Sequence, residues 1–182
     1  MSIKTDYILK ALQVLSWIIF VGLCIEAGGF ITNMVATLML TPEGASKFWK
    51  EADLTAVYHH NQSHYVTLAS LIIIATVLKA LIFYFIVKVF HNKKLNLSKP
   101  FNEVVSQFVL IIAYLSLGIG IFSFWGTKFI GQLVNQGVQL PDILPLRLGG
   151  ADVWLFMGVT LLIIAFMFKK GVEIQNENDL TI

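Results

Sequence analysis

One apolar run near the end of the sequence limits the fold more than any other feature. Residues 152–168 contain no charged side chain after Asp152, and a basic pair followed by a glycine comes next, at 169–171. A helix of this length rises ~1.5 Å per residue and nearly crosses a hydrocarbon core of roughly 30 Å. Asp152 and Lys169 would mark the two edges of that core. We therefore expect an integral membrane protein that ends in a polar, non-helical tail at 169–182.

The composition agrees with lipid as the solvent for most of the chain. The sequence is 57% hydrophobic and 13% charged, whereas soluble domains carry about 25% charged residues. Four apolar stretches occur, at about 11–40, 65–90, 104–127 and 152–168. None alternates with a period of two, so helices are favoured over a membrane barrel. We expect a single all-α domain over 1–182, folded as an integral membrane four-helix bundle.

The segments between the spans differ in kind. The first apolar stretch continues through Leu40, which is too long for a cleaved signal peptide, and is read as a retained span. Thr41 and Pro42 are typical of a helix start and predict a short amphipathic helix at 42–54, lying in the membrane interface. The last link, 128–151, is rich in Gly and Pro and is read as an irregular loop outside the membrane.

Small and polar residues recur at heptad spacing in all four spans. We call each such line of residues a seam. In chain order, the seams of the four spans are Gly22, Glu26, Gly29, Asn33 and Ala36; Ala69, Thr76 and Lys79; Ala113, Ser116, Gly120, Ser123 and Thr127; and Ala151, Gly158 and Ala165. Small side chains allow close backbone approach between spans, and a repeat of 3.5 residues predicts left-handed packing.

Lys and Arg are distributed unevenly between the two sides of the predicted bundle. One side carries Lys4, Lys10, Lys88, Lys93, Lys94, Lys99, Lys169 and Lys170, and the other carries Lys47, Lys50, Lys128 and Arg147. Because the basic side of a membrane protein faces the cytoplasm, both termini are expected there.

Two ionisable residues, Glu26 and Lys79, lie well inside predicted spans. An uncompensated charge at the centre of a span costs at least ~2.5 kcal/mol, so the two are expected to form an intramembrane ion pair. The pair could fix helix register, or it could belong to a proton or ion relay. Glu26 is predicted nearer the outer side and Lys79 nearer the inner side, so pairing would require the first span to slide outward.

Other candidate chemistry is sparse. His60 and His64 are spaced by four and would share one helix face, which makes them weak candidates for zinc ligands; a hydrated polar loop is the alternative. The single cysteine, Cys24, leaves no partner for an intrachain disulfide. No pattern typical of a cofactor site or of a nucleophile–base pair occurs, so no enzyme activity and no cofactor are expected. The net charge of +2 does not indicate direct nucleic-acid binding.

The end of the chain carries a family resemblance. Residues 168–182 close on Glu-Asn-Asp-Leu-Thr-Ile after a basic helix end, and the link before the third span contains Lys99-Pro100-Phe101-Asn102. The chain thereby resembles a family of small bacterial four-span membrane proteins of unknown function, sometimes called YoaS-like. The resemblance implies a bacterial cytoplasmic (inner) membrane location. Members are often paired genetically with a small helix-turn-helix regulator, which implies a sensory or regulatory role.

These observations favour a non-enzymatic membrane protein with a cytoplasmic surface that engages a protein partner, either such a regulator or another membrane protein. The surface would combine the basic link with the acidic tail, and its residues are Lys93, Lys94, Lys99, Glu173, Glu177 and Asp179. A small transporter or channel subunit that uses Glu26 and Lys79 is the alternative.

Overall fold

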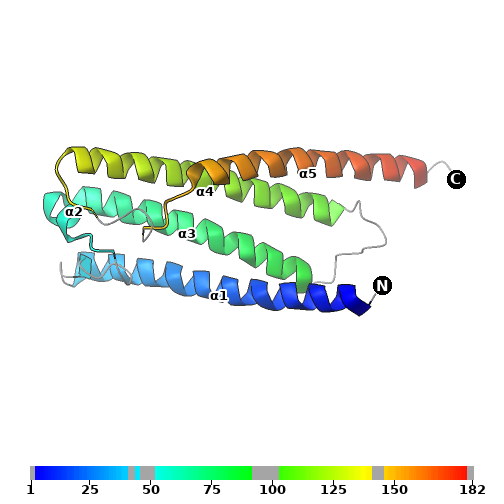
Figure 1. Ribbon diagram of the computed structural model, residues 1–182, viewed down its shortest axis with the longest axis horizontal. Helices are drawn as coiled ribbons and strands as arrows, with labels where there is room; N and C mark the ends of the chain where they lie inside the picture. Colours follow the sequence, from blue (N-terminus) through cyan, green and yellow to red (C-terminus); the bar gives the residue numbers. More distant parts are fainter. Residues whose placement is uncertain (1–2, 41–43, 46–51, 92–102, 141–145, 180–182) are drawn as a thin grey trace.

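A computed structural model describes residues 3–40, 44–45, 52–91, 103–140 and 146–179, with only the backbone described for 3–6 and 178–179. Its helices are α1 (Ile3–Met39), α2 (Thr55–His60), α3 (Gln62–His91), α4 (Glu103–Asn135) and α5 (Ala151–Asp179) (Figure 1). The four long helices are each long and apolar enough to cross a membrane. The predicted all-α class and the four spans are therefore confirmed, and the protein is a multi-pass membrane protein.

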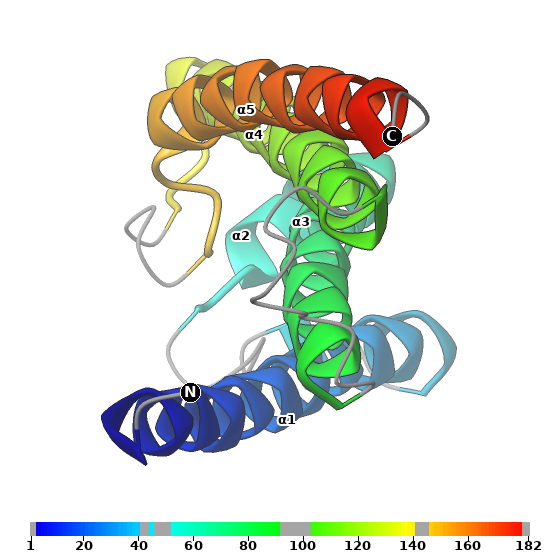
Figure 2. The same ribbon diagram turned by 90° about the vertical axis from the view of Figure 1, so that its right-hand side faces the viewer.

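The four long helices pack in chain order. Helix α1 lies on α3, α3 on α4, and α4 on α5. Seen end on, they form a bent row, with α1 at one end and the α4–α5 pair at the other (Figure 2). Both chain termini lie at one end of the bundle, called here the termini end; the opposite end is called the loop end (Figure 1). The predicted bundle is thus an open row, in which α1 joins the other helices mainly through α3.

Helix α5 is displaced along the bundle axis relative to α4. It begins beside the middle of α4 and extends past the first residue of α4 at the termini end (Figure 1). Gly120 of α4 packs directly against Leu155 of α5, and the Ser106 hydroxyl of α4 donates a hydrogen bond to the Ala165 carbonyl of α5 at 3.4 Å. Helix α4 has 33 residues, or roughly 50 Å, against a hydrocarbon core of roughly 30 Å. If the apolar run of α5 marks the membrane, the last turns of α4 stand beyond it at the loop end.

The loop end holds the main buried core. Its largest side chains come from α1, α2, α3, α4 and the segments that connect them: Phe30, Leu54, Val57, Tyr65, Leu68, Ile72, Leu133, Leu146 and Leu148. Buried apolar surface of this kind stabilises a fold in contact with water. The core therefore joins the helices and their connecting segments at the loop end.

A short helix does follow the first span in the described chain: α2, over Thr55–His60. Where the predicted helix at 42–54 is described, it is not α-helical: 44–45 form a 3₁₀ turn and 52–54 are non-helical. The Asp53 carboxylate accepts the Thr55 N–H at 2.8 Å, and hydrogen bonds from Thr55 lower the pKa of Asp53. This local bond starts the helix two residues after the acid. The rest of the predicted helix, residues 42–43 and 46–51, lies outside the described chain.

The polar tail is helical, which corrects the prediction of a helix end at 169–171. Helix α5 runs through Gly171 to Asp179 without interruption. A glycine inside a helix costs only about 1 kcal/mol, so it does not by itself end one. Lys170 also pairs with Glu173 one turn later, at 3.1 Å, which supports the continued helix.

The predicted seams are confirmed in α3, α4 and α5. Ala151 and Thr127 are half-buried, and the other small residues of these seams are buried: Ala69, Thr76, Ala113, Ser116, Gly120, Ser123, Gly158 and Ala165. In α1 the prediction holds only in part. Glu26 is buried and Gly29, Asn33 and Ala36 are half-buried, but Gly22 is exposed, and the other buried positions in the described part of this helix are Ser16, Ala27, Phe30 and Thr37. The reason is that α1 packs against the other helices through large side chains such as Phe30, which enter the core, and not through close approach of its backbone. The left-handed crossing stays a prediction.

Candidate functional site

Glu26 and Lys79 lie at the same level of the bundle. Phe20 of α1 meets Tyr84 of α3, with ring centroids 6.1 Å apart. One apolar groove is lined by residues on both sides of Glu26 and Lys79: Cys24, Ala27 and Gly28 of α1, and Val77, Ala80 and Leu81 of α3. Helix α1 is therefore shifted toward the loop end, as pairing of the two residues requires. The separation in depth expected from the sequence is removed by this shift.

The loop before α5 brings a third charged residue, Arg147, to the same place. Its neighbours Leu146 and Leu148 are fully buried, which anchors the loop between the helices. The absence of a side chain at Gly126 makes room for Leu148, because an added Cβ there would lie 2.6 Å from a Leu148 methyl carbon. The Thr127 hydroxyl lies 3.4 Å from the Leu148 carbonyl oxygen. Residues 146–148 are thus packed against α4.

Arg147 itself has a backbone that few non-glycine residues adopt. Its φ is +58°, and it is the only non-glycine residue with positive φ in the described part of the chain. This left-handed conformation costs of order 1–2 kcal/mol. Such strain persists only where the surrounding structure enforces it, and here the two buried leucines on either side do so. The strained backbone directs the side chain and the carbonyl of Arg147 to different partners.

Arg147 connects the two predicted residues. Its Nε lies 2.7 Å from Glu26 Oε1, and its carbonyl oxygen accepts a hydrogen bond from Lys79 Nζ at 2.8 Å. Lys79 Nζ also lies 5.8 Å from the ring centroid of Trp154, in the first turns of α5. The prediction of a direct Glu26–Lys79 pair is corrected accordingly: the two charges meet through Arg147. We call Glu26, Lys79 and Arg147 together the charged site.

The charged site joins four segments, namely α1, α3, the loop before α5, and α5 itself. The Glu26 side chain is 11% exposed and that of Arg147 is 58% exposed, so the carboxylate is shielded while part of the guanidinium is open.

Gly118 of α4 lies beside Leu78, and Gly158 of α5 lies beside Leu117. These contacts place the backbone of Lys79 level with Gly158. It therefore lies about six residues, or roughly 9 Å, from the start of the apolar run of α5 at residue 152, in the direction of the termini end. Its long side chain reaches back toward that edge, as snorkelling lysines do.

Sequence reasoning missed the role of Arg147. It was counted only as a positive charge of the outer loop, since nothing in a Gly- and Pro-rich link indicates that it folds back between spans. The one available signal was electrostatic, because a carboxylate shielded inside a bundle requires a cation with good geometry. Two cations, Lys79 and Arg147, could have supplied it, and only the structure distinguishes between them.

The two candidate metal ligands, His60 and His64, lie together at the loop end. The rings of His60 and His64 are stacked with centroids 5.5 Å apart, and His64 meets Phe129 edge to face at 5.6 Å. Over the ranges that the structure describes, no group of three or more His, Cys, Asp or Glu side chains could hold a metal ion. In this arrangement His64 packs against Phe129 and is half-buried, whereas His60 is exposed.

The predicted partner surface is only partly described. Glu173 is exposed and pairs with Lys170 of its own helix, and Glu177 is also exposed. Lys93, Lys94 and Lys99 lie outside the described residues, as does the side chain of Asp179. Whether the acidic tail meets the basic link stays a prediction.

The fold and the charged site define a class: a four-span helical membrane protein in which a loop arginine connects the first span to the others. Residues 40–182 match the model of the family described as "Protein of unknown function (DUF2975)", and the chain belongs to this family. No curated protein and no solved structure matches the chain. The family match includes Lys79 and Arg147 but begins after Glu26.

Proposed function

We propose that this protein is a non-enzymatic regulatory membrane protein that relays the state of the charged site, through α5, to a protein partner in the cytoplasm. The observation that carries the proposal is the continuity of α5. This one helix of 29 residues starts next to Arg147, holds Trp154 against Lys79, and extends past α4 at the termini end (Figure 1). A rigid helix with one end at each place can couple a change at the charged site to a contact outside the membrane.

The projecting end of α5 has the composition of a binding surface. Lys170, Glu173 and Asn176 are exposed, and Ile174 among them is 49% exposed. An apolar side chain exposed on a polar helix beyond the hydrocarbon core provides an anchor for a partner. The family resemblance points to a small helix-turn-helix regulator as that partner, and another membrane protein would fit the same helix.

The orientation required by this proposal places both termini in the cytoplasm of a bacterium, as the distribution of Lys and Arg indicates. In a Cys24→Ser background, a cysteine at Asn135 should react with a membrane-impermeant maleimide in intact cells, because Asn135 is exposed at the loop end. A cysteine at Asn176 should react only after the cells are opened. Labelling of Asn176 alone in intact cells would reverse the orientation.

The partner contact can be tested by site-specific photo-crosslinking in living cells. A photoreactive amino acid at Asn176 should capture a discrete protein, because this exposed position lies on the projecting part of α5. The same amino acid at Gln132, exposed in α4 near the loop end, is the matched control and should not capture that protein. Identical products from both positions, or none from Asn176, would contradict the proposal.

A further inference from the structure

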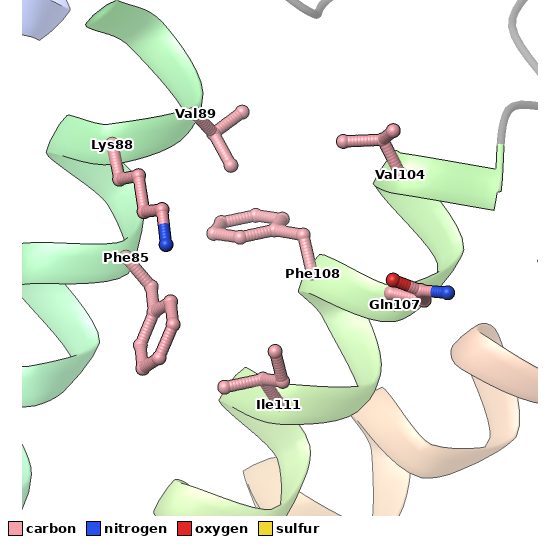
Figure 3. Close-up of a pocket in the computed structure, with 7 residues that line it drawn as sticks. All are labelled: Phe85, Lys88, Val89, Val104, Gln107, Phe108 and Ile111. Atoms are coloured by element: carbon pink, nitrogen blue, oxygen red, sulfur yellow. The ribbon is translucent and has the colours of Figure 1, made fainter. Parts of the chain in front are cut away.

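A groove between α3 and α4 near the termini end has the features of a lipid site (Figure 3). It has a volume of about 170 Å³, and it is lined by Phe85, Lys88, Val89, Val104, Gln107, Phe108 and Ile111. Five of these seven side chains are apolar, and Lys88 supplies the positive charge. The groove therefore offers an apolar floor and one cationic group.

The position of the groove matches the headgroup level of a membrane. On α4, Ser106 lies against Ala165 of α5, four residues before Lys169 ends the apolar run. The groove residues Val104 and Phe108 flank Ser106 in sequence. A molecule bound there would hold its polar part at the water boundary and its apolar part inside the hydrocarbon core.

The charge of the groove favours an anion. In Figure 3 the Lys88 ammonium points into the space between the helices, and it lies 5.9 Å from the ring centroids of both Tyr84 and Phe85. Aromatic faces attract a cation without neutralising it. The nearby carboxylate of Glu103 accepts a hydrogen bond from the Gln107 amide nitrogen at 3.3 Å, and that nitrogen is on the side of Gln107 away from Lys88 in Figure 3. No ion pair of Lys88 with another described residue occurs, so within the described chain its charge is available to a phosphate.

The size of the groove decides between possible occupants. A partner helix is about 10 Å across with its side chains, so it would lie over a groove of about 170 Å³ and not inside it. Part of an acyl chain is narrow enough to lie along Phe85, Phe108 and Ile111. We propose that this groove binds an anionic phospholipid, with its phosphate on Lys88 and an acyl chain between α3 and α4.

Native mass spectrometry of the full-length protein tests this site. The detergent-solubilised protein is given equal amounts of phosphatidylglycerol and phosphatidylcholine, and the ratio of the two bound lipids is measured. The wild type should prefer phosphatidylglycerol. Lys88→Gln should lower that preference about fivefold, because a lysine near anionic lipid contributes about 1 kcal/mol.

Two further variants make the test specific. Lys10→Gln removes an exposed lysine of α1 at the same end of the bundle and should leave the preference unchanged. Ile111→Trp fills the groove and should reduce binding of both lipids. Equal binding of the two lipids by the wild type would overturn the proposal. So would an equal effect of Lys10→Gln and Lys88→Gln, or full lipid binding by Ile111→Trp.

Discussion

Replacing Gly120 by Ala is expected to lower the free energy of unfolding by about 1–3 kcal/mol, the usual cost of overpacking a close-packed interior. A Cβ at this position would lie 2.6 Å from Leu155 Cγ and 3.0 Å from the Leu155 backbone nitrogen. The side chain could rotate away, but the backbone nitrogen can retreat only if α4 and α5 separate. Gly158 faces Leu117 in the same way, with an added Cβ 2.9 Å from the Leu117 nitrogen.

The matched control for Gly120→Ala lies in the same helix. Gly131 also belongs to α4, and an added Cβ there would meet no atom within 4 Å. Gly131→Ala should therefore be neutral or stabilising by up to about 1 kcal/mol, because Ala favours the helix. Reversible unfolding in mixed micelles measures both variants. Equal effects at the two positions would show that α4 and α5 are not in backbone contact at Gly120.

The second large effect is expected at the charged site. Glu26→Gln removes the negative charge that faces Arg147, and Arg147→Gln removes the positive charge that faces Glu26. In a double-mutant cycle the two changes should show a coupling energy of about 1–2 kcal/mol. This value lies between the ~0–1 kcal/mol of exposed pairs and the ~3–5 kcal/mol lost when a buried pair is broken, because only the carboxylate is well shielded.

A second cycle distinguishes Arg147 from Lys79 as the direct partner of Glu26. Lys79 donates to the Arg147 carbonyl, a bond that an Arg147→Gln change leaves in place. The coupling between Glu26→Gln and Lys79→Met should thus be smaller than that between Glu26→Gln and Arg147→Gln. A larger Glu26–Lys79 coupling would restore the direct pair that the sequence suggests.

Much of the fold could be predicted because lipid restricts it so strongly. A chain that must satisfy every backbone hydrogen bond within a hydrocarbon core forms helices, and the four apolar stretches locate them. The seams of α3, α4 and α5 were also predictable, since residues such as Gly120 and Gly158 pack where helix backbones approach closely.

Other features depended on contacts between distant segments. The register of α1 is set by Phe30 entering the core at the loop end, and the small-residue pattern around Gly22 carries no information about that contact. Arg147 reaches Glu26 only because Leu146 and Leu148 anchor a loop that reads as irregular chain. In the tail, the helix-forming Lys and Glu residues around Gly171 outweigh the cost of one glycine, and α5 continues through it.

The proposed coupling between the charged site and the projecting end of α5 is tested most directly by one comparison. Capture of the partner through the photoreactive amino acid at Asn176 is measured in the wild type and in Glu26→Gln, with Lys10→Gln as the control for loss of a charge on α1. Coupling energies between sites are typically about 1–3 kcal/mol, or roughly 5–150-fold. We predict that Glu26→Gln changes the captured amount at least fivefold, while Lys10→Gln leaves it unchanged. Equal capture by the wild type and by a folded, membrane-inserted Glu26→Gln protein would contradict the coupling.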